Sequence, residues 1–203
     1  MATLYLASAS PRRRELLAYL GVAFTVEVSR FDEEALKARI SDPAQYVRAA
    51  ALGKARNVAS RRAGIILGCD TDVALDGVIL SKPVDAGDAA RMLRTLSGQT
   101  HSVHSAVALL ESDGATVTRQ DMRVVETRVT FDTLSDAAIA AYVATGDPLD
   151  KAGAYGIQTG GIAFVRRVDG DLSSVIGLPL PTVREMLTAF GVPLWNGSNR
   201  AAV

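Results

Sequence analysis

The feature that most constrains the fold is a junction between an apolar run and a basic turn near the start of the chain. Residues 4–7 read Leu-Tyr-Leu-Ala, and a leucine-bearing helical pattern follows the turn Ser8-Ala9-Ser10-Pro11-Arg12-Arg13-Arg14. Pro11 suits the first position of a helix, because the N–H that proline lacks would have no intrahelical partner there. The Ser10 hydroxyl can cap the free amides. We therefore predict a strand that leads directly into a capped helix.

The same turn carries groups that bind phosphate esters. Free helix N–H groups, the hydroxyls of Ser8 and Ser10, and the guanidinium groups of Arg12, Arg13 and Arg14 are expected to converge there. The alternative is an ordinary capped helix with solvated arginines, which so short a motif does not exclude by itself.

Strand-like and helix-like segments alternate along most of the chain, which is typical of an α/β fold. Extended segments are predicted at 3–8, 22–28, 65–69, 101–110, 123–131 and 161–168, with a hairpin of 73–75 and 78–80 around Asp76-Gly77. Helices are predicted at 11–20, 43–60, Asp85 to Gly98, Ser135 to Val143, and Pro181 to Phe190. The sequence contains no internal repeat and no low-complexity linker. We therefore expect one domain over 1–203, formed by two lobes, with a frayed tail at 195–203.

Composition limits the kind of partner. The 203 residues carry 22 Lys and Arg against 22 Asp and Glu, so no overall positive field favours nucleic acid or an anionic membrane, and a small ligand is expected. The one cysteine, Cys69, follows an apolar run and is predicted to be a packed thiol in a reducing compartment. Without a leader pattern or an apolar stretch of membrane-spanning length, we expect a soluble cytoplasmic protein.

Lys54 violates the helical pattern of its segment. It follows Val47 by seven residues and therefore shares the apolar stripe of Val47, Ala51 and Val58. One explanation is a packed stem whose ammonium reaches water. The other is a cation directed into a cleft.

Asp70 is a second candidate, because it comes just after the predicted strand 65–69. Ligands in open α/β sheets bind beyond the carboxyl ends of strands. A helix-capping aspartate is the ordinary alternative, but a hairpin pattern follows here. A carboxylate at this position could hold a divalent cation or orient a water molecule.

Lys82 and Glu33 complete a set with a common chemistry. Cations that grip a polyphosphate, together with carboxylates that hold a metal and activate water, are what phosphoanhydride hydrolysis requires. His101 and His104 have no evident zinc-ligand partners and are predicted to be structural. Neither a P-loop nor a Rossmann glycine signature occurs in the sequence.

Together these residues resemble the Maf family, nucleoside triphosphate pyrophosphatases once described as septum-formation inhibitors. The resemblance runs nearly end to end and rests on eight segments in order: Ser8-Ala9-Ser10-Pro11-Arg12-Arg13, Asp32-Glu33, Lys54-Ala55, Asp70-Thr71, Lys82-Pro83, Leu96-Ser97-Gly98-Gln99-Thr100-His101, Asp150-Lys151-Ala152-Gly153-Ala154-Tyr155-Gly156-Ile157-Gln158 and Gly177-Leu178-Pro179-Leu180.

The resemblance implies an α/β fold with a mixed twisted sheet, helices on both faces and two lobes around a cleft, like that of the inosine triphosphate pyrophosphatases. It also implies a homodimer that uses Mg²⁺ or Mn²⁺ to convert a nucleoside triphosphate into the monophosphate and pyrophosphate.

The resemblance assigns roles to single residues. Asp70 would be the proton acceptor that activates water, and Glu33 would help Asp70 to hold the metal. Lys54 and Lys82 would bind phosphates beside Arg13. The other substrate-binding positions of the basic turn are Ser8 and Ser10.

Within the family, the segment 150–158 is similar to the branch that acts on dTTP and UTP, and differs from the branch that acts on 7-methyl-GTP. Arg12, Thr71 and Gln158 match positions that set the choice of base. A glutamine amide offers both a donor and an acceptor, as a pyrimidine edge with carbonyl and N–H groups requires.

Three residues depart from the family pattern. Thr159 replaces a usual glycine and could narrow the base pocket, and Gly53 stands where a longer side chain is common. Asp72 replaces an apolar residue and adds a negative charge near the expected metal. It could raise the affinity for the metal, but we expect it to be solvated, since lone carboxylates are seldom buried. Two alternatives to dTTP and UTP hydrolysis stay open: action on 7-methyl-GTP or another modified nucleotide, or a nucleotide-binding regulator of septum formation that does not need turnover.

Overall fold

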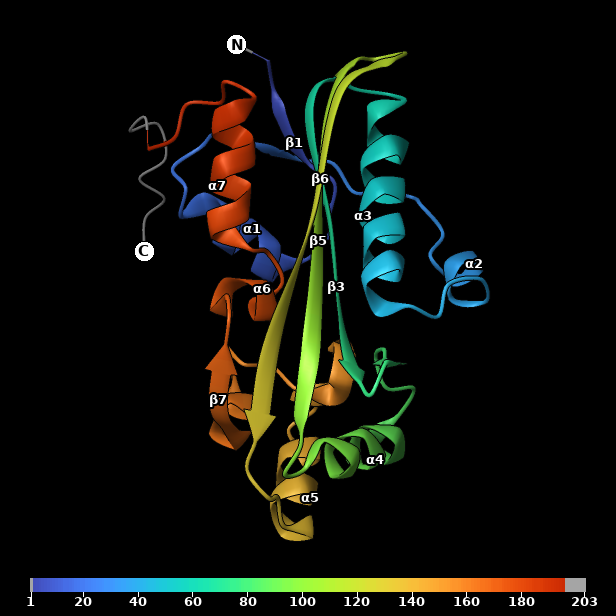
Figure 1. The fold of residues 1–203 in the computed structure, drawn as a ribbon, viewed down its shortest axis with the longest axis vertical. Coiled ribbons are helices and arrows are strands. Elements are labelled where there is room, and N and C mark those ends of the chain that lie inside the picture. The colour runs from blue at the N-terminus through green and yellow to red at the C-terminus, as the bar shows by residue number, and fades with distance from the viewer. Residues whose placement is uncertain (1, 196–203) are drawn as a thin grey trace.

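The computed structural model describes residues 2–195, which form a twisted, mixed β-sheet flanked by helices (Figure 1). The strand order is β2-β1-β3-β5-β6-β7, and β4 pairs with β3. β1 is parallel to β2 and β3, and the other pairs are antiparallel. The strands are β1 (Leu4–Leu6), β2 (Thr25–Val26), β3 (Ala63–Leu75), β4 (Val78–Leu80), β5 (Thr100–Asp113), β6 (Val117–Phe131) and β7 (Val165–Asp169). The predicted mixed sheet is confirmed.

The five predicted helices begin close to the predicted positions, and the short helices α2 and α6 were not predicted. The helices are α1 (Pro11–Ala18), α2 (Glu34–Lys37), α3 (Pro43–Ala59), α4 (Ala86–Leu96), α5 (Asp136–Ala144), α6 (Leu172–Ile176) and α7 (Leu180–Ala189), with 3-10 turns η1 (Asp147–Asp150), η2 (Ala152–Ala154) and η3 (Gly160–Phe164). Side chains cap the first turns: Ser10 accepts from the Arg13 N–H in α1, as predicted, and Asp42 accepts from the Gln45 N–H in α3.

Helices cover both faces of the sheet in the upper part of the molecule (Figure 1). Alternate residues of β5 point to opposite sides. Val107 and Leu109 pack with residues of α1 and α7, whereas Ala106 and Leu110 pack with residues of α3. β3 alternates in the same way. Its even-numbered residues therefore face α3. Asp70 and Asp72 are both even-numbered, so both lie on the α3 side of the sheet.

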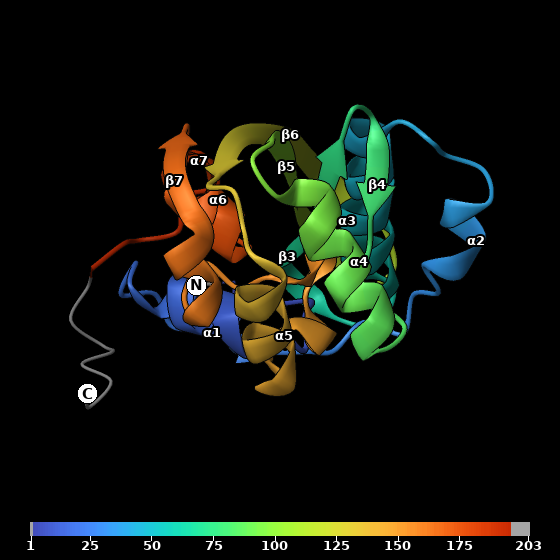
Figure 2. The ribbon, with the colours of Figure 1, turned by 90° about the horizontal axis from the view of Figure 1, so that it is seen from below.

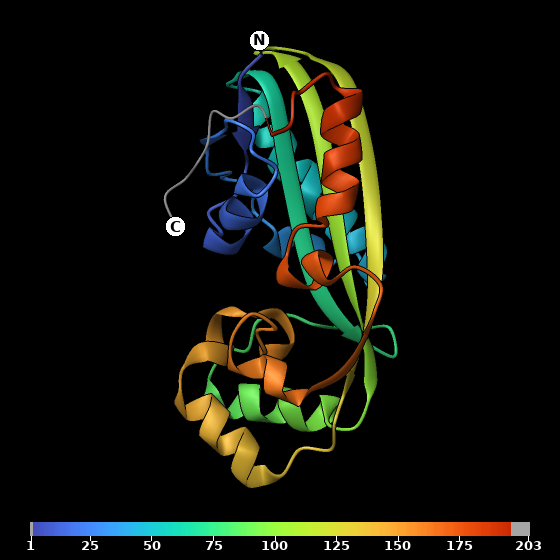
Figure 3. The same cartoon turned by 90° about the vertical axis from the view of Figure 1, so that its left-hand side faces the viewer.

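A second lobe lies at the far end of the three long strands β3, β5 and β6 (Figure 3). Figure 2 shows α4 and α5 side by side at this end, and α2 at the margin of the molecule beyond α3. The lobe has its own core, in which Phe131, Tyr155 and Phe164 pack with Leu93, Ile139 and neighbouring residues. The predicted two lobes thus have separate cores joined by continuous strands.

Three sequence predictions need correction. Asp70 does not follow the end of a strand: β3 runs through it to Leu75 and enters the hairpin, whose Asp76 and Gly77 both have positive φ. The segment 161–168 begins as the 3-10 turn η3, and only 165–169 is strand. Trp195, placed in the predicted tail, donates from its backbone N–H to the Leu20 carbonyl, and residues 196–203 lie outside the described residues.

Candidate active site

A cleft of about 780 Å³ lies between the lobes and contains most of the predicted site residues. It opens beside a smaller cavity of about 350 Å³ that Ser8 lines. Each of the ten predicted residues lines one or both: Ser8, Ser10, Arg12, Arg13, Glu33, Lys54, Asp70, Thr71, Lys82 and Gln158. Arg14 lines neither and is exposed, so the predicted convergence of three guanidinium groups is wrong for the third.

The basic turn is fixed by its own hydroxyls. Ser8 Oγ accepts from the Ser10 N–H at 3.2 Å and from Arg13 Nη1 at 3.3 Å. Arg13 Nε donates to the Gly177 carbonyl at 3.0 Å, which ties α1 to the end of α6. The guanidinium of Arg13 is thus oriented before any anion arrives, as a phosphate-binding group should be.

Lys54 lies between two carboxylates. Its Nζ is 2.6 Å from Asp70 Oδ1 and 2.9 Å from Glu33 Oε1, and its side chain is only 12% exposed. An ammonium that merely reached for water would be solvated, so the cleft-directed interpretation is confirmed. We call Glu33, Lys54 and Asp70 the Lys54 cluster.

Two glycines, Gly68 and Gly53, let the elements that carry the Lys54 cluster approach one another closely. A Cβ on Gly68 would lie 2.4 Å from the Ala51 carbonyl, so only glycine lets β3 approach α3 this closely. A Cβ on Gly53 would lie 2.4 Å from the Phe31 ring, which fills the space that a longer side chain would take. Gly53 therefore lets the loop that carries Glu33 pack onto α3.

Burial raises the pKa of Asp70, and the nearby charges of Lys54 and Arg13 oppose that rise only in part. A carboxylate with a raised pKa is a better proton acceptor than an exposed aspartate. The position therefore suits a group that takes a proton from water.

Asp72 corrects a prediction. The expected solvated carboxylate is buried, with 5% exposure, because the alternation of β3 places it on the same face as Asp70. It accepts from the Val73 N–H at 2.9 Å and from Ser81 Oγ at 3.4 Å. Burial raises the pKa of Asp72 to about 7, and the negative charge of Asp70 contributes to the rise.

The remaining predicted residues differ in their hydrogen bonding and in their exposure. Thr71 Oγ1 lies 2.7 Å from Ser105 Oγ and 3.3 Å from the Gly177 carbonyl. Gln158 and Lys82 are exposed side chains that line the cleft. His101 is a buried core residue whose Nε2 is 2.8 Å from Tyr155 Oη, which confirms its structural role.

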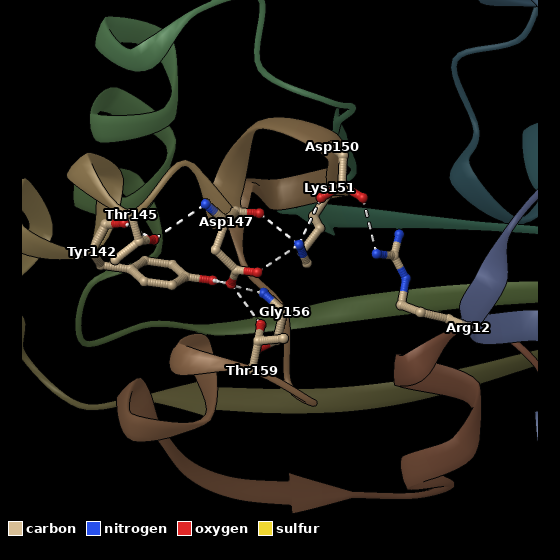
Figure 4. A network of polar contacts seen from close by, with 8 residues as sticks. All are labelled: Arg12, Tyr142, Thr145, Asp147, Asp150, Lys151, Gly156 and Thr159. Carbon is tan, nitrogen blue, oxygen red and sulfur yellow. Dashed lines mark hydrogen bonds and ion pairs between the residues drawn. The ribbon is translucent and has the colours of Figure 1, made fainter. Parts of the chain in front are cut away.

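A second group of charged side chains beside the cleft, which contains Asp147, Asp150 and Lys151, was not predicted from the sequence (Figure 4). Lys151 Nζ donates to Asp147 Oδ1 at 2.9 Å, to Asp150 Oδ1 at 2.6 Å and to the Asp147 carbonyl at 2.6 Å, and its side chain is 10% exposed. Asp150 Oδ2 in turn accepts from Arg12 Nη1 at 3.0 Å and so connects the two lobes. We call Asp147, Asp150 and Lys151 the Lys151 cluster. In the sequence it looks like a polar loop, and only the segment 150–158 pointed to it.

The Lys54 cluster offers a donor set that fits a hard divalent cation. Two carboxylates already hold a positive charge between them, and Mg²⁺ is commonly bound by one or two carboxylates with substrate phosphates completing its shell. Within residues 2–195, no three His, Cys, Asp or Glu side chains form a group that could bind a metal by themselves. Phosphate and water oxygens would have to supply the other ligands.

Residues 3–190 match the family model described as Maf-like protein. The chain belongs to the Maf family. It is 50% identical over 200 residues to the dTTP/UTP pyrophosphatase of Moorella thermoacetica, covering 96% of this chain and 98% of that one. It is 46% identical over 198 residues to that of Symbiobacterium thermophilum, covering 97% and 98%. It is 51% identical over 192 residues to that of Escherichia coli O157:H7, covering 94% of each chain.

This Maf-family chain has no described helix in residues 2–195 that combines the length and apolar character needed to cross a lipid bilayer.

Proposed function

We propose that this Maf-family chain hydrolyses dTTP and UTP to the nucleoside monophosphate and pyrophosphate. The observation that carries the proposal is the Lys54 cluster, which sets the buried carboxylate of Asp70, with its raised pKa, beside cations in a cleft large enough for a nucleotide. The names of relatives about half identical to the chain support the same substrates.

In the proposed reaction, Asp70 accepts a proton from the water that attacks the α-phosphorus. The new bond joins the water oxygen to phosphorus, and the bond to the β-phosphate oxygen breaks, which releases pyrophosphate. Arg13, Lys54 and Lys82 stabilise the negative charge that spreads over the phosphoryl oxygens. Ser8 and Ser10 hold the turn that presents Arg13.

Glu33 and Asp70 would hold Mg²⁺ or Mn²⁺. When bound, a divalent cation neutralises phosphate charge and polarises the scissile bond. We expect a chelator to abolish pyrophosphate release and either metal to restore it. Titration calorimetry with Mn²⁺ should show weaker binding for Glu33→Gln than for the wild type.

Arg12, Thr71 and Gln158 are proposed to select the base. The Gln158 amide is exposed on the cleft and can pair with both a carbonyl and an N–H of a pyrimidine edge. We also infer a homodimer in the cytoplasm, from the family resemblance and from the single buried cysteine. Light scattering should then give about twice the chain mass of 21.4 kDa.

The test is a pyrophosphate-release assay over ordinary, deoxy and 7-methylated nucleoside triphosphates. Asp70→Asn should lower kcat by about 100-fold or more, because a general base of this kind contributes 10²- to 10⁴-fold. Asp76→Asn is the matched control, since Asp76 lies in the β3–β4 turn outside the cleft lining and asparagine tolerates its positive φ. Release from 7-methyl-GTP alone would contradict the assigned base, and equal kcat for Asp70→Asn would contradict the assigned proton acceptor.

A further inference from the structure

The turn Gly156–Thr159 carries Gln158 to the cleft. Its two ends meet in a hydrogen bond from the Thr159 N–H to the Gly156 carbonyl at 3.2 Å. The space inside is tight: a Cβ on Gly156 would lie 2.4 Å from Thr159 Oγ1 and 2.6 Å from Lys151 Cε. The conformation of this turn therefore determines where the Gln158 amide lies.

Both ends of the turn are held by one carboxylate oxygen (Figure 4). Thr159 Oγ1 donates directly to Asp147 Oδ2 at 2.6 Å. At the other end, the Gly156 N–H donates to Tyr142 Oη at 3.0 Å, and Tyr142 Oη donates to the same Asp147 Oδ2 at 2.5 Å. Burial and the adjacent carboxylate raise the pKa of Tyr142 to about 12, so its hydroxyl stays a donor.

Further hydrogen bonds hold Asp147 itself in place. Its Oδ1 accepts from Lys151 Nζ at 2.9 Å, and its backbone N–H donates to Thr145 Oγ1 at 3.2 Å. Charged acceptors with several donors make strong and geometrically restrictive networks. The network therefore restricts the conformation of the turn at both of its ends.

We propose that Asp147 and Thr159 are positioning residues that fix the turn 156–159, so that Gln158 meets the edge of a pyrimidine base. This inference rests on the proposed function, because it deepens the assignment of Gln158 to base recognition. Asp147 and Thr159 act through the turn, and the phosphate-binding residues Ser8, Arg13, Lys54 and Lys82 lie outside the network.

The experiment compares two substitutions of Thr159. Thr159→Val keeps the shape and removes the hydroxyl, whereas Thr159→Ser keeps the hydroxyl. Thr188→Val removes a hydroxyl of similar exposure from α7, away from the cleft, and serves as the control. Steady-state kinetics are measured for dTTP, UTP, ATP and GTP, with inorganic tripolyphosphate as a base-free inhibitor, and melting temperatures are recorded for every variant.

For Thr159→Val we expect KM for dTTP and UTP to rise about tenfold, the factor expected from losing one hydrogen bond to a charged acceptor. Its kcat and its inhibition by tripolyphosphate should stay at the wild-type values, because the phosphate contacts are untouched. Thr159→Ser should restore most of the affinity. In Asp147→Ala, which removes the acceptor, adding Thr159→Val should raise KM much less than it does in the wild type, since Thr159 Oγ1 then keeps only the Gly156 carbonyl as a partner, at 3.1 Å.

An unchanged KM for dTTP in Thr159→Val would overturn the inference, as would an equal rise in KM for all four nucleotides and in the inhibition constant of tripolyphosphate. Calorimetric binding of a non-hydrolysable dTTP analogue separates this result from failure of the proposed function. If the wild type binds the analogue but does not hydrolyse dTTP, the hydrolase proposal fails, while binding of the analogue to Thr159→Val still tests the turn. If the wild type does not bind it, both proposals are overturned.

Discussion

Lys54 and Lys151 line the same cleft, each between two carboxylates and with little of its side chain exposed, yet the pKa values of Asp70 and Asp147 shift in opposite directions. Next to Lys54, burial outweighs the cations and raises the pKa of Asp70. Next to Lys151, burial would also raise the pKa of Asp147, but hydrogen bonds from Thr159, Tyr142 and Lys151 outweigh it and lower the value. Asp150 behaves like Asp147, through its bonds to Lys151 and Arg12.

The difference follows from how each carboxylate is solvated. Asp70 is 6% exposed and accepts a hydrogen bond from Lys54. Asp147 accepts from three donors and lies near the surface. A charge that is poorly compensated takes up protons easily, and a fully hydrogen-bonded charge does not. The Lys54 cluster is therefore suited to proton transfer, and the Lys151 cluster to holding a fixed geometry.

The largest effect is expected for Lys54→Met, which keeps the stem and removes the ammonium. Loss of a cation aimed at developing phosphoryl charge should lower kcat about 100- to 1000-fold. Turnover of dTTP per folded molecule, with the folded fraction taken from circular dichroism, measures this. A kcat within a few-fold of the wild-type value would contradict the catalytic role of the Lys54 cluster.

Lys151→Met should instead act on stability. It leaves Asp147, Asp150 and the Asp147 carbonyl without their shared donor, and the loss of hydrogen bonds to charged groups should lower the free energy of unfolding by about 2 kcal/mol. Urea denaturation measures the free energy of unfolding, and kcat of the folded fraction should change little. Undiminished stability combined with a kcat loss as large as that of Lys54→Met would make the two clusters equivalent.

We expect Asp72 to make the free energy of unfolding change with pH. Its pKa of about 7 exceeds its ordinary value of 3.8, so the folded state holds the proton more tightly than the unfolded chain does. Ionisation therefore lowers stability as pH rises from about 4 to about 7. The full shift corresponds to roughly 4 kcal/mol, and we expect about half of that because Asp72 lines the cleft, where water can reach it.

Asp72→Asn does not ionise in this interval. Its stability relative to the wild type should therefore increase by roughly 2 kcal/mol between pH 4 and pH 8, measured by urea denaturation at both values. Asp76→Asn, on the same hairpin but exposed, should show no such increase. A difference between Asp72→Asn and wild type that stays constant with pH would contradict the buried, proton-binding carboxyl.

The smallest effect is expected for Asp150→Asn. The pair between Arg12 and Asp150 is well exposed, with side-chain exposures of 34% and 63%, and such pairs contribute about 1 kcal/mol or less. Urea denaturation should show a loss below that of Lys151→Met. An equal loss would mean that Asp150, and not the buried contact with Asp147, holds the Lys151 cluster together.

The sequence predicts the Lys54 cluster better than the Lys151 cluster, for physical reasons. Lys54 breaks an apolar helical stripe, so local periodicity exposes it. Lys151 lies between two short 3-10 turns, where no helical or strand periodicity marks which side chains are buried. The local pattern therefore does not reveal its contacts with Asp147 and Asp150.

Asp72 and Asp70 show a second limit. Strand alternation would have placed both carboxylates on one face, but only if β3 were known to continue past Cys69. The apolar run ends there, and the ladder with β5, which pairs Asp70 with Ala106 and Asp72 with His104, is a non-local contact. The mixed sheet and the helix caps were predictable because their signals are local or repeated.

The most direct test is a carbon-13 NMR titration of the aspartate carboxyl groups, with resonances assigned from Asp70→Asn and Asp147→Asn. We predict that Asp70 titrates above its ordinary pKa of 3.8 and Asp147 below it, in the same sample. If Asp70 titrated at or below 3.8, or if both carboxyls shifted in the same direction, the division between a proton-accepting cluster and a positioning cluster would be contradicted.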